Sequence, residues 1–552
     1  MEKVWLKHYQ DGVQAEVDTN AFTSLAQLIE SSNEQYSQLP AFSCMGKTLT
    51  YQEMNDQGRA LGAYLSSHLQ LEKGDRVAVM MPNILQNPIS IQAILRAGLT
   101  VVNVNPLYTA RELEHQLKDS GAKAIIIVEN FAHVLQEVIA RTQIKHVILT
   151  SLGESLSFPK SLIVNFVIRK IKKMVPEYKL PQAISFSQAL SHGENLEFRQ
   201  HKVSADDIAF LQYTGGTTGL SKGAMLSHGN LIANIQQAYA WLEKYVEPGR
   251  ETIITALPLY HIFALTANCL TYMKIGGHNI LIPNPRDIPG FIKELKKYPF
   301  TAFTGVNTLF VALMNDPSIA EVDFSSLKLT LGGGMAVQKP VADQWKKLTK
   351  IALIQAYGLT ETSPAAVINP LDLEEFNGAI GLPLPSTEVS IRDDDNKELT
   401  FGEAGEICIR GPQVMKGYWQ RPEETAKVFT ADGWLKTGDI ATIDEKGFIY
   451  IVDRKKDMIL VSGFNVYPNE IEEVVVSHKG VLEAAAIGVP DEKSGEVVKI
   501  FAVKKDENLG SKELLAYCKE NLTGYKVPKY IEFREDLPKT NVGKILRRAL
   551  RD

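Results

Sequence analysis

The chain has 552 residues, and 59 lysines and arginines against 64 aspartates and glutamates give a formal net charge of −5. Apolar residues make up 45% and charged residues 22%, which is ordinary for globular proteins. This composition excludes a collagen-like or disordered chain, and the slightly acidic balance argues against a general nucleic-acid binder, which needs a basic face. At about 150 residues per domain, the length predicts three or four globular units.

The cysteines and the chain ends carry few signals. The four cysteines lie far apart and form no Cys-x-x-Cys pair, which predicts neither a zinc site nor a disulfide framework. The first ten residues lack the basic-then-apolar order of a signal peptide, and no run reaches about 18 apolar residues. The last residues carry no lipidation or peroxisomal signal. We therefore expect a cytoplasmic protein with reduced thiols.

Strand and helix signals alternate through the first two thirds of the chain. Short apolar runs at 76–81, 101–104 and 124–128 are separated by helical patterns at 89–97 and 110–118. A similar alternation returns at 252–257, 279–282, 291–297 and 301–304. Apolar runs separated by helices are typical of parallel strands with crossover helices. Residues from about 20 to 380 are therefore predicted to form α/β layers.

The pattern changes after about residue 381. Strand signals become denser and turns shorter, which predicts a small antiparallel β unit with strands at 388–393, 405–410 and 447–453. A polar, hinge-like stretch at 453–457 precedes a tail that predicts helices at 468–478 and 511–521 and strands at 484–489 and 497–503. The predicted domains are a large N-terminal body at 1–452, made of two α/β subdomains and the β unit, a hinge at 453–456, and a small, mobile α+β C-terminal domain at 457–552.

Residues 162–175 form a separate pattern. Ile163, Phe166, Val167, Ile171 and Met174 recur at helical spacing, and four basic residues crowd the other side of the helix, at positions 169, 170, 172 and 173. A basic amphipathic helix can lie on an anionic membrane surface. The alternative is an ordinary packed helix with a solvated basic face.

The sharpest local signal is the glycine-rich run at 213–223. Three glycines within five residues are interleaved with hydroxyl side chains and followed by Lys222, directly after the apolar run at 208–211. Glycines let backbone N–H groups converge on an anion, and the hydroxyls and the lysine add donors, so the run predicts a phosphate-binding loop. It does not have Walker A spacing. Residues 46–48 end like a Walker A motif, but Ala41 stands where its first glycine should be, so they are not interpreted as one.

These residues belong to an ordered set of motifs. The set comprises 213–223, Leu-Pro-Leu-Tyr-His at 257–261, three glycines at 332–334, Tyr-Gly-Leu-Thr-Glu at 357–361, 433–439, 453–457 and 538–544. In this order the motifs resemble the adenylate-forming superfamily of acyl-CoA synthetases, peptide-synthetase adenylation domains and luciferases, over nearly the whole chain. Within it, bacterial long-chain fatty-acid–CoA ligases are the group to which the sequence is most similar.

The resemblance implies a two-step reaction. A carboxylate joins the α-phosphate of ATP and releases pyrophosphate, and the coenzyme A thiol then displaces AMP. Because the first step brings two anions together, neutralising charge is the central demand. The resemblance assigns catalytic roles to Lys544, Thr214, Glu361 and His261, with Lys544 bridging the carboxylate and the α-phosphate and Glu361 associated with Mg²⁺, a cation that favours oxygen ligands. A histidine in such a stretch is often a core residue, so that alternative stays open for His261.

The resemblance also implies how nucleotide and coenzyme A are held. Asp439 and Arg454 would hold the ribose, Tyr357 would stack on the adenine beside the three glycines, Lys456 would be the hinge residue, and Ser462–Gly463 would contact the pantetheine arm. The full set of expected binding residues is Tyr213, Thr214, Gly215, Gly216, Thr217, Thr218, Gly219, Ser221, Lys222, Gly223, Gly332, Gly333, Gly334, Tyr357, Gly358, Thr360, Asp439, Arg454, Lys456, Ser462 and Gly463.

The expected substrate is a long-chain fatty acid held in an apolar tunnel lined by 261–265 and 304–310. Some relatives carry an aromatic gate where this chain has Leu265. The alternatives are a medium-chain or aryl acid–CoA ligase, a carrier-protein-loading ligase, a luciferase, or a lipid-binding protein without activity. The expected partners are the fatty acid, ATP, coenzyme A and, peripherally, the inner face of the cytoplasmic membrane; a homodimer is also expected, and no nucleic acid.

Overall fold

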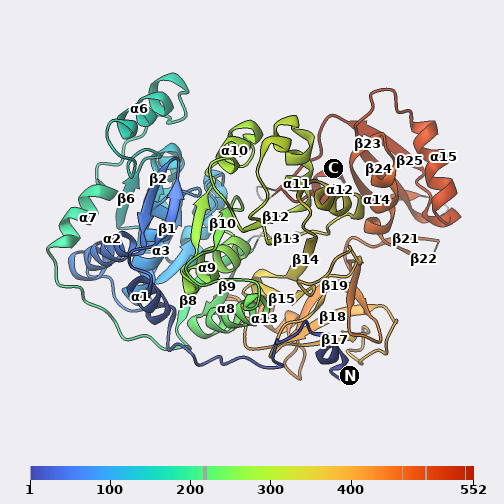
Figure 1. Cartoon of the computed structure of the whole chain (residues 1–552), viewed down its shortest axis with the longest axis horizontal. Helices are drawn as coiled ribbons and strands as arrows, with labels where there is room; N and C mark the ends of the chain where they lie inside the picture. Colours follow the sequence, from blue (N-terminus) through green and yellow to red (C-terminus); the bar gives the residue numbers. More distant parts are fainter. Residues whose placement is uncertain (1, 215–220, 463, 492–493, 541–542, 552) are drawn as a thin grey trace.

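The computed structural model describes residues 2–214, 221–462, 464–491, 494–540 and 543–551. Within these ranges the strands form four sheets, of seven, nine, four and five strands. The two largest sheets form the body, the four-stranded sheet lies below it, and the five-stranded sheet forms the C-terminal unit on the right of Figure 1. The expected α/β architecture with a small C-terminal unit is confirmed.

The seven-stranded sheet is parallel except at one edge, where β8 and β9 pair antiparallel. In spatial order its strands are β7 (Ala183–Ser185), β6 (His146–Thr150), β5 (Ala124–Val128), β3 (Arg76–Met80), β4 (Thr100–Asn103), β8 (Ile208–Thr214) and β9 (Lys222–Ser227). The central strands are buried along their whole length, which explains why they appear in the sequence as continuous apolar runs.

The nine-stranded sheet has a parallel centre and antiparallel edges. Its strands in spatial order are β16 (Leu382–Pro383), β15 (Ala365–Ile368), β14 (Leu353–Gly358), β13 (Leu329–Gly333), β12 (Ala302–Gly305), β10 (Thr252–Thr255), β11 (His278–Leu281), β1 (Pro40–Cys44) and β2 (Lys47–Thr50). Residues 46–48 belong to the turn and strand that follow β1, so the resemblance to a Walker A ending has no phosphate-binding counterpart there.

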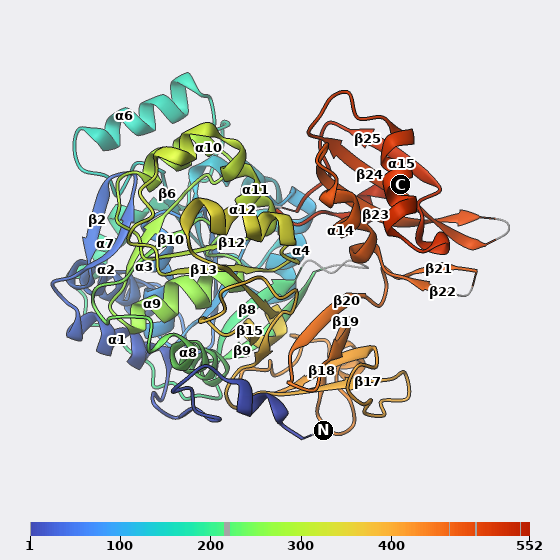
Figure 2. The same cartoon turned by 45° about the vertical axis from the view of Figure 1, so that its right-hand side comes forward.

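Helices fill the space between the two large sheets and cover their outer faces (Figures 1 and 2). One apolar core joins residues of both sheets, such as Phe210 and Leu331, and a second core covers the other face of the nine-stranded sheet around Trp345. The body helices are α1 (Leu25–Gln35), α2 (Tyr51–Ala63), α3 (Gln86–Arg96), α4 (Ala110–Ser120), α5 (Ala132–Val138), α6 (Lys160–Phe166), α7 (Phe186–Glu194), α8 (His228–Leu242), α9 (Thr271–Lys274), α10 (Ile288–Leu295), α11 (Asn307–Asn315), α12 (Lys339–Thr349) and α13 (Pro422–Val428).

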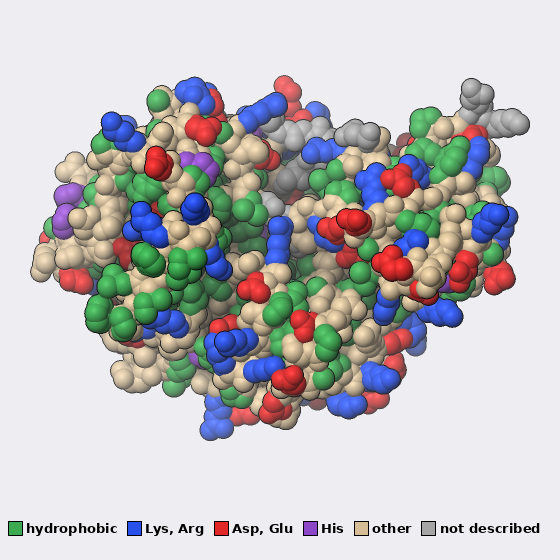
Figure 3. Space-filling model, turned by 90° about the horizontal axis from the view of Figure 1, so that it is seen from above, with side chains coloured by type: hydrophobic (Ala, Val, Ile, Leu, Met, Phe, Trp, Pro, Cys, Tyr) green, Lys and Arg blue, Asp and Glu red, His purple; other side chains and the backbone are tan. Residues whose placement is uncertain are grey.

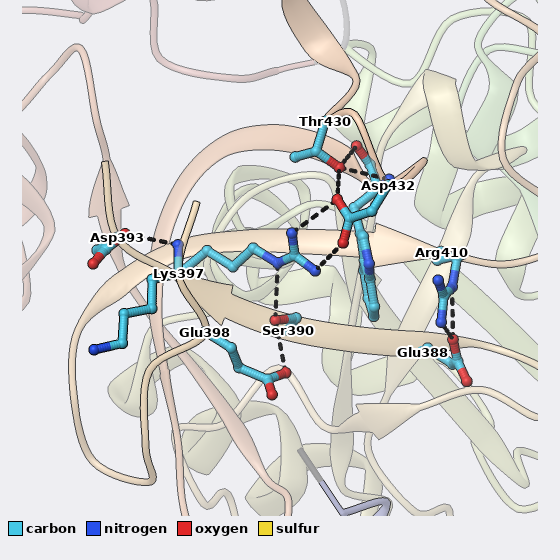
Figure 4. A network of polar contacts seen from close by, with 10 residues as sticks. Glu388, Ser390, Asp393, Lys397, Glu398, Arg410, Thr430 and Asp432 are labelled. Atoms are coloured by element: carbon cyan, nitrogen blue, oxygen red, sulfur yellow. Dashed lines mark hydrogen bonds and ion pairs between the residues drawn. The ribbon is translucent and has the colours of Figure 1, made fainter. Parts of the chain in front are cut away.

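The four-stranded antiparallel sheet is the predicted β unit. Its strands are β17 (Glu388–Arg392), β18 (Gly405–Arg410), β19 (Leu435–Ile443) and β20 (Ile449–Arg454). A polar network fixes one end of it: Arg392 forms a two-pronged ion pair with Asp432 at 2.9 and 3.1 Å, and its Nε donates to Ser390 Oγ (Figure 4). Arg392 and Arg410 both stack on Trp434. The network is structural, because none of these residues lines the main cavity.

The C-terminal unit has its own sheet and its own apolar core. Its elements are β21 (Ile459–Val461), β22 (Phe464–Val466), α14 (Pro468–Ser477), β23 (Val481–Asp491), β24 (Gly495–Lys504), α15 (Ser511–Asn521) and β25 (Tyr530–Arg534). The body's last strand, β20, ends at Arg454, and β21 begins at Ile459. Only the short stretch 455–458 therefore connects the two sheets, and the proposed hinge residue Lys456 lies within it.

The glycines at 332–334 mark the end of β13, which includes Gly332 and Gly333. The helix expected at 162–175 is α6 followed by a wider helical turn over Val167–Ile171, and its apolar side chains are exposed rather than packed. The helix therefore does not follow the ordinary packed alternative. Among the described helices, none is long and apolar enough to cross a membrane.

Gly381 joins the nine-stranded sheet to the β unit, because it pairs with Ile449 across the two sheets. Its φ of +118° is unfavourable for other residues, and a Cβ there would lie 2.1 Å from the backbone nitrogen of Asn369. We expect Gly381→Ala to lower the free energy of unfolding by about 3 kcal/mol, from backbone strain and overpacking together. Urea denaturation measures this effect.

Gly378→Ala is the matched control. Gly378 also has a positive φ, of +76°, but a Cβ there meets no atom within 4 Å, so only the cost of the backbone conformation, about 1 kcal/mol, applies. Equal losses of stability in the two variants would contradict the proposed clash at the sheet junction.

Candidate active site

A cavity of about 1970 Å³ lies where the body, the β unit and the C-terminal unit meet. It is lined by the ends of β8, β13 and β14, by β19 and β20, and by the loop that carries Lys544. β13 and β14 are parallel neighbours in the nine-stranded sheet and β8 is parallel to β4 in the seven-stranded sheet, and the carboxyl ends of such strands are where α/β sheets usually bind ligands.

The strand ends bring together residues from separate motifs. Thr214 is the last residue of β8, Gly333 and Gly334 stand at the end of β13, and Tyr357 and Gly358 close β14. All five line the cavity, and Thr360 follows on the same loop. A Cβ at Gly334 would lie 3.4 Å from Lys544 Cε, so a side chain at this position would crowd the lysine.

Asp439 connects the β unit to this edge. The hydroxyl of Tyr357 donates to Asp439 Oδ2 at 2.7 Å, and Arg454 Nε lies 3.5 Å from Oδ1. Burial, with the Asp439 charge as a second cause, raises the pKa of Tyr357 far above its ordinary value, so the phenol stays protonated and keeps donating. The two side chains that the sequence assigned to ribose and adenine are therefore in direct contact.

Glu361 lies on the short loop after β14. The Tyr418 hydroxyl donates to its Oε1 at 2.7 Å, and its backbone oxygen accepts from Met415 N. Among the described residues, this hydrogen bond from Tyr418 orients the carboxylate, which lines the cavity. The described residues contain no cluster of three or more His, Cys, Asp or Glu side chains that could hold a metal ion by itself. A cation here would therefore need ligands from phosphates, as Mg²⁺ commonly does.

Lys544 enters the cavity from the C-terminal unit. Its loop is docked on α11 by a hydrogen bond from Thr308 Oγ1 to the backbone oxygen of Gly543 at 3.0 Å. Burial, followed by the charge of Arg454, lowers the pKa of Lys544 to about 8. Asp439 and Glu361 act in the opposite direction and favour the ammonium form. The loop thus delivers a cation to a cavity edge that already carries two carboxylates.

His261 lines the cavity beside this edge. Burial, followed by the Lys544 charge, lowers its pKa to about 3, so the imidazole is neutral at physiological pH. Its loop is held by Asn83, whose side-chain nitrogen donates to the backbone oxygens of Thr255 and Leu257 and whose oxygen accepts from Leu259 N. A neutral histidine here can accept or donate a hydrogen bond but does not supply charge.

The glycine-rich loop is described only at its ends. Gly215, Gly216, Thr217, Thr218 and Gly219 lie outside the described residues, and so does Gly463. At the ends, Tyr213 donates to Asp119 Oδ2 at 2.7 Å, His115 contacts the backbone oxygen of Ser221, and Lys222 forms an ion pair with Glu424. Tyr213, Ser221 and Lys222 line the cavity.

Three expected binding residues do not line the cavity in this arrangement: Gly223, Gly332 and Ser462. Gly223 packs under the Tyr213 ring and accepts a hydrogen bond from Trp419 N. Gly332 faces Val337 on the other side of β13. Ser462, in the β21–β22 hairpin, donates from its backbone to Ser494 within the C-terminal unit. Lys456 does line the cavity.

Part of the cavity extends away from the charged edge as an apolar arm. It runs between one face of the nine-stranded sheet, with Leu329, Leu331 and Gly333 of β13, and the helices α8 and α9 with the helical segment η6 (Ala264–Leu270). The three β13 residues alternate along the strand and so share a face, and four strand steps at about 3.3 Å make the arm about 13 Å deep. The predicted tunnel residues Phe263 and Thr304 line it, whereas Leu265 does not line the cavity.

Arg547, three residues after Lys544, is the centre of a second charged cluster. Its guanidinium forms a two-pronged ion pair with Glu472, at 2.7 and 2.9 Å, and donates to Asn469 Oδ1, both on α14. It also lies 3.7 Å from Asp453, in β20, and 3.5 Å from Asp457, within the 455–458 connection. Asp453 is fully buried, and burial raises its pKa to about 6.

The sequence reasoning missed several of these residues. Tyr418 contacts the predicted Glu361, and Arg547 lies near Asp453 of the predicted hinge. Thr308 was expected only as part of the tunnel segment 304–310, but it holds the backbone of Gly543 next to Lys544. No local pattern marks them, because their roles depend on tertiary contact. Glu424 gave no signal either, although it pairs with the predicted phosphate-binding Lys222.

The chain resembles known proteins over its whole length. The profile of the AMP-binding enzyme family matches residues 29–419, and that of the AMP-binding enzyme C-terminal domain matches residues 470–544. A long-chain-fatty-acid–CoA ligase of Salmonella typhimurium is 58% identical, covering 100% of this chain and 98% of that protein. Feruloyl-CoA synthase of an Amycolatopsis species is 34% identical, over 92% and 94%. The crystal structure of ATP-bound MatB from Rhodopseudomonas palustris is 28% identical, with a TM-score of 0.82 over 95% and 98%.

Replacement of Arg547 tests how the loop that carries Lys544 is anchored. We expect Arg547→Ala to destabilise the C-terminal unit by about 3 kcal/mol, because it leaves buried carboxylates without their cation. Hydrogen exchange of the β23 and β24 amides should then be about a hundredfold faster than in the unchanged protein. The stability lost in Arg547→Ala should become smaller as pH falls from 7.5 to 5. Asp453 has a raised pKa, so its protonation in this range removes the unpaired charge.

Arg551→Ala is the control, because Arg551 is more exposed and its guanidinium pairs, among the described residues, with Asp457 alone at 2.9 Å. An Arg547→Ala variant that exchanges no faster than Arg551→Ala, or whose loss grows at low pH, would contradict the anchoring role.

Proposed function

The chain is a member of the AMP-binding enzyme family, and we propose that it is a long-chain fatty-acid–CoA ligase. One observation carries the proposal: Lys544, from a separate unit, lies in a cavity that also holds Glu361 and Asp439 and continues into an apolar arm. The ligase relatives, 58% identical over the full chain, support the choice of acid and of coenzyme A.

In the first half-reaction, a carboxylate oxygen of the fatty acid attacks the α-phosphorus of ATP. A new P–O bond forms, the bond to the bridging oxygen breaks, and pyrophosphate leaves. Lys544 neutralises the two approaching anions, and Thr214 and the glycine-rich loop hold the phosphates. Asp439 accepts from the ribose hydroxyls with Arg454 beside it, and Tyr357 contacts the adenine. Neutral His261 orients the carboxylate end of the acid.

Mg²⁺ is part of this proposal. Glu361 has one carboxylate oxygen held by Tyr418 and lines the cavity, so the residues present fit a cation shared with substrate phosphates. When bound, the ion would offset phosphate charge as the pyrophosphate leaves.

In the second half-reaction, the coenzyme A thiol attacks the acyl carbon. A C–S bond forms, AMP leaves with its electron pair, and the thiol proton is lost to solvent. Lys544 has to withdraw to admit the thiol, and we propose that the C-terminal unit rotates about Lys456. Ser462 and Gly463 would then reach the pantetheine arm. The exposure of Leu460 and Phe464 on the same hairpin supports this, because apolar side chains favour a second packed position.

The fatty acyl tail would lie in the apolar arm. A lining that spans about 13 Å of strand suits an extended aliphatic tail better than a single aromatic ring, which favours an aliphatic acid over an aryl acid. Each methylene buried there contributes about 0.8 kcal/mol, so we expect a broad range of accepted lengths.

Replacement of Lys544 tests the first half-reaction. We expect Lys544→Ala to slow acid-dependent ATP–pyrophosphate exchange by about 10²- to 10³-fold, since removing one group that stabilises developing charge has effects of this size. Lys539→Ala is the control, because Lys539 lies on the same segment, pairs with Glu483 and Asp536, and does not line the cavity. In the unchanged protein, kcat/KM should fall as pH rises through about 8, where Lys544 loses its proton.

Three outcomes would overturn this proposal. Exchange at the unchanged rate in Lys544→Ala would remove the lysine from the mechanism. Acyl transfer to a carrier protein in place of coenzyme A would favour a carrier-loading ligase, and exchange with aryl acids alone would favour an aryl acid ligase.

We also propose that the protein docks peripherally on an anionic membrane. The docking face consists of exposed apolar side chains on and around α6: Phe158, Leu162, Ile163, Phe166, Ile171 and Met174. Figure 3 looks onto the face that carries α6 and shows hydrophobic side chains gathered on its left, with Lys and Arg nearby. Lys170, Lys172 and Lys173 supply positive charge, whereas Arg169 is paired with Glu129. Exposed apolar groups beside free lysines fit an anionic bilayer.

Vesicle sedimentation tests this docking. We expect the triple variant Lys170→Gln, Lys172→Gln, Lys173→Gln to bind anionic vesicles at least tenfold more weakly, because each lysine near the surface contributes about 1 kcal/mol. A triple variant of Lys479, Lys505 and Lys512, exposed lysines of the C-terminal unit, removes the same charge elsewhere. Equal losses in the two triple variants would show a general charge effect and contradict docking through α6.

A further inference from the structure

Tyr9 and Gln10, near the N-terminus, lie directly behind the far end of the apolar arm. Gln10 is only 5% exposed. Its Nε2 donates to the backbone oxygen of Trp241 at 2.6 Å, and its Oε1 accepts from the backbone nitrogen of Leu371. Trp241 and Leu371 both line the cavity, whereas Gln10 does not. One side chain therefore ties together two parts of the wall from outside.

The hydrogen bonds of Gln10 satisfy backbone groups that would otherwise lack partners. Trp241 lies in the last turn of α8, where helix carbonyls have no partner within the helix. Leu371 follows β15 and lies outside regular structure. Buried backbone groups are nearly always paired, so the wall depends on Gln10 for its position.

The indole of Trp241 is also fixed from other directions. The Tyr9 ring packs edge-on against it, with 5.0 Å between ring centroids. The indole N–H donates to the backbone oxygen of Asn369 at 3.0 Å, and the Tyr9 hydroxyl donates to Pro383 O at 2.6 Å. Trp241 is 1% exposed, so a tail that pushed against the indole would have to displace this whole arrangement.

Trp241 stands at the end of the arm farthest from the charged edge. The side of α8 that lines the arm runs from Asn234 to Leu242, about 12 Å along the helix axis. Asn234 is hydrogen-bonded to Ala365, which pairs with Gly358 beside the site, whereas Trp241 contacts Asn369 at the opposite end of β15. The length along the helix agrees with the depth of about 13 Å along β13.

We infer that Gln10 is a positioning residue for substrate specificity: it holds Trp241 as the end wall of the acyl arm and so sets the longest unbranched tail that the enzyme accepts. The inference rests on the proposed function. It assigns the N-terminal segment a role in choosing the substrate, although none of the described residues of this segment lines the cavity.

Chain-length profiles test the inference. ATP–pyrophosphate exchange is measured with straight-chain saturated acids from octanoate to eicosanoate for the unchanged protein, Gln10→Ala, Gln10→Met and Trp241→Leu. Methionine fills a similar volume without the hydrogen bonds, so it keeps the test valid if the alanine variant folds poorly. We expect the ratio of kcat/KM for eicosanoate to that for octanoate to rise in all three variants, by about fourfold for each methylene newly accommodated.

Gln236→Ala is the matched control. Gln236 also lies on α8 and also tethers the N-terminal segment, through Asp18 O at 3.3 Å, but it does not line the arm. In Gln236→Ala, the ratio of kcat/KM for eicosanoate to that for octanoate should equal the ratio in the unchanged protein. An unchanged ratio in both Gln10 variants, with a raised ratio in Trp241→Leu, would overturn the role of Gln10. An unchanged ratio in Trp241→Leu as well would show that the tail does not reach this wall. Absence of exchange with every acid in the unchanged protein would instead refute the proposed function.

Discussion

The site depends on bringing one cation into a cavity whose acidic groups come from another part of the fold. Glu361 and Asp439 are fixed by the body and the β unit, through Tyr418 and Tyr357. Lys544 arrives from the C-terminal unit. Its loop is held by the hydrogen bond from Thr308 to the backbone oxygen of Gly543, and its charge is attracted to the two carboxylates. Burial opposes its charge, so the lysine is a cation with a pKa near neutrality rather than a permanent one. The position of the C-terminal unit thus controls the charge of the site.

The sequence could predict those parts of the site that lie in contiguous motifs. The strand ends at Gly333 and Tyr357 were predictable because a short apolar run followed by glycines or a polar loop is a local signal. The contacts that orient these motifs join segments far apart in the chain, such as Tyr418 with Glu361 and Gln10 with Trp241. The hydrophobic periodicity of the sequence gives no signal for such pairs. Patterning also could not decide whether the apolar face of α6 is packed, because a buried and an exposed amphipathic helix have the same spacing.

The two apolar features of the molecule lie in different settings. The arm is enclosed between the nine-stranded sheet and α8, and its end wall is tied by Gln10. The face on α6 is open, and α6 is attached to the first strands of the nine-stranded sheet through a hydrogen bond from Lys160 to the backbone oxygen of Met45. Enclosure supports selection among tails, whereas an open surface supports contact with an extended partner. The fold therefore keeps an enclosed apolar arm apart from an open apolar surface.

The anchoring of Arg547 affects how fast Lys544 can leave the cavity. Lys544 and Arg547 are three residues apart, and Arg547 is bound to two side chains of α14, which packs on the sheet of the C-terminal unit. The lysine therefore cannot leave the cavity by a change of rotamer in its loop alone, a motion that takes picoseconds to nanoseconds. In the proposed rotation the lysine leaves together with about a hundred residues of the C-terminal unit, and collective motions of this kind take microseconds to milliseconds. The proposed change between half-reactions is therefore expected to follow the slow motion of a folded unit and not the fast motion of single side chains.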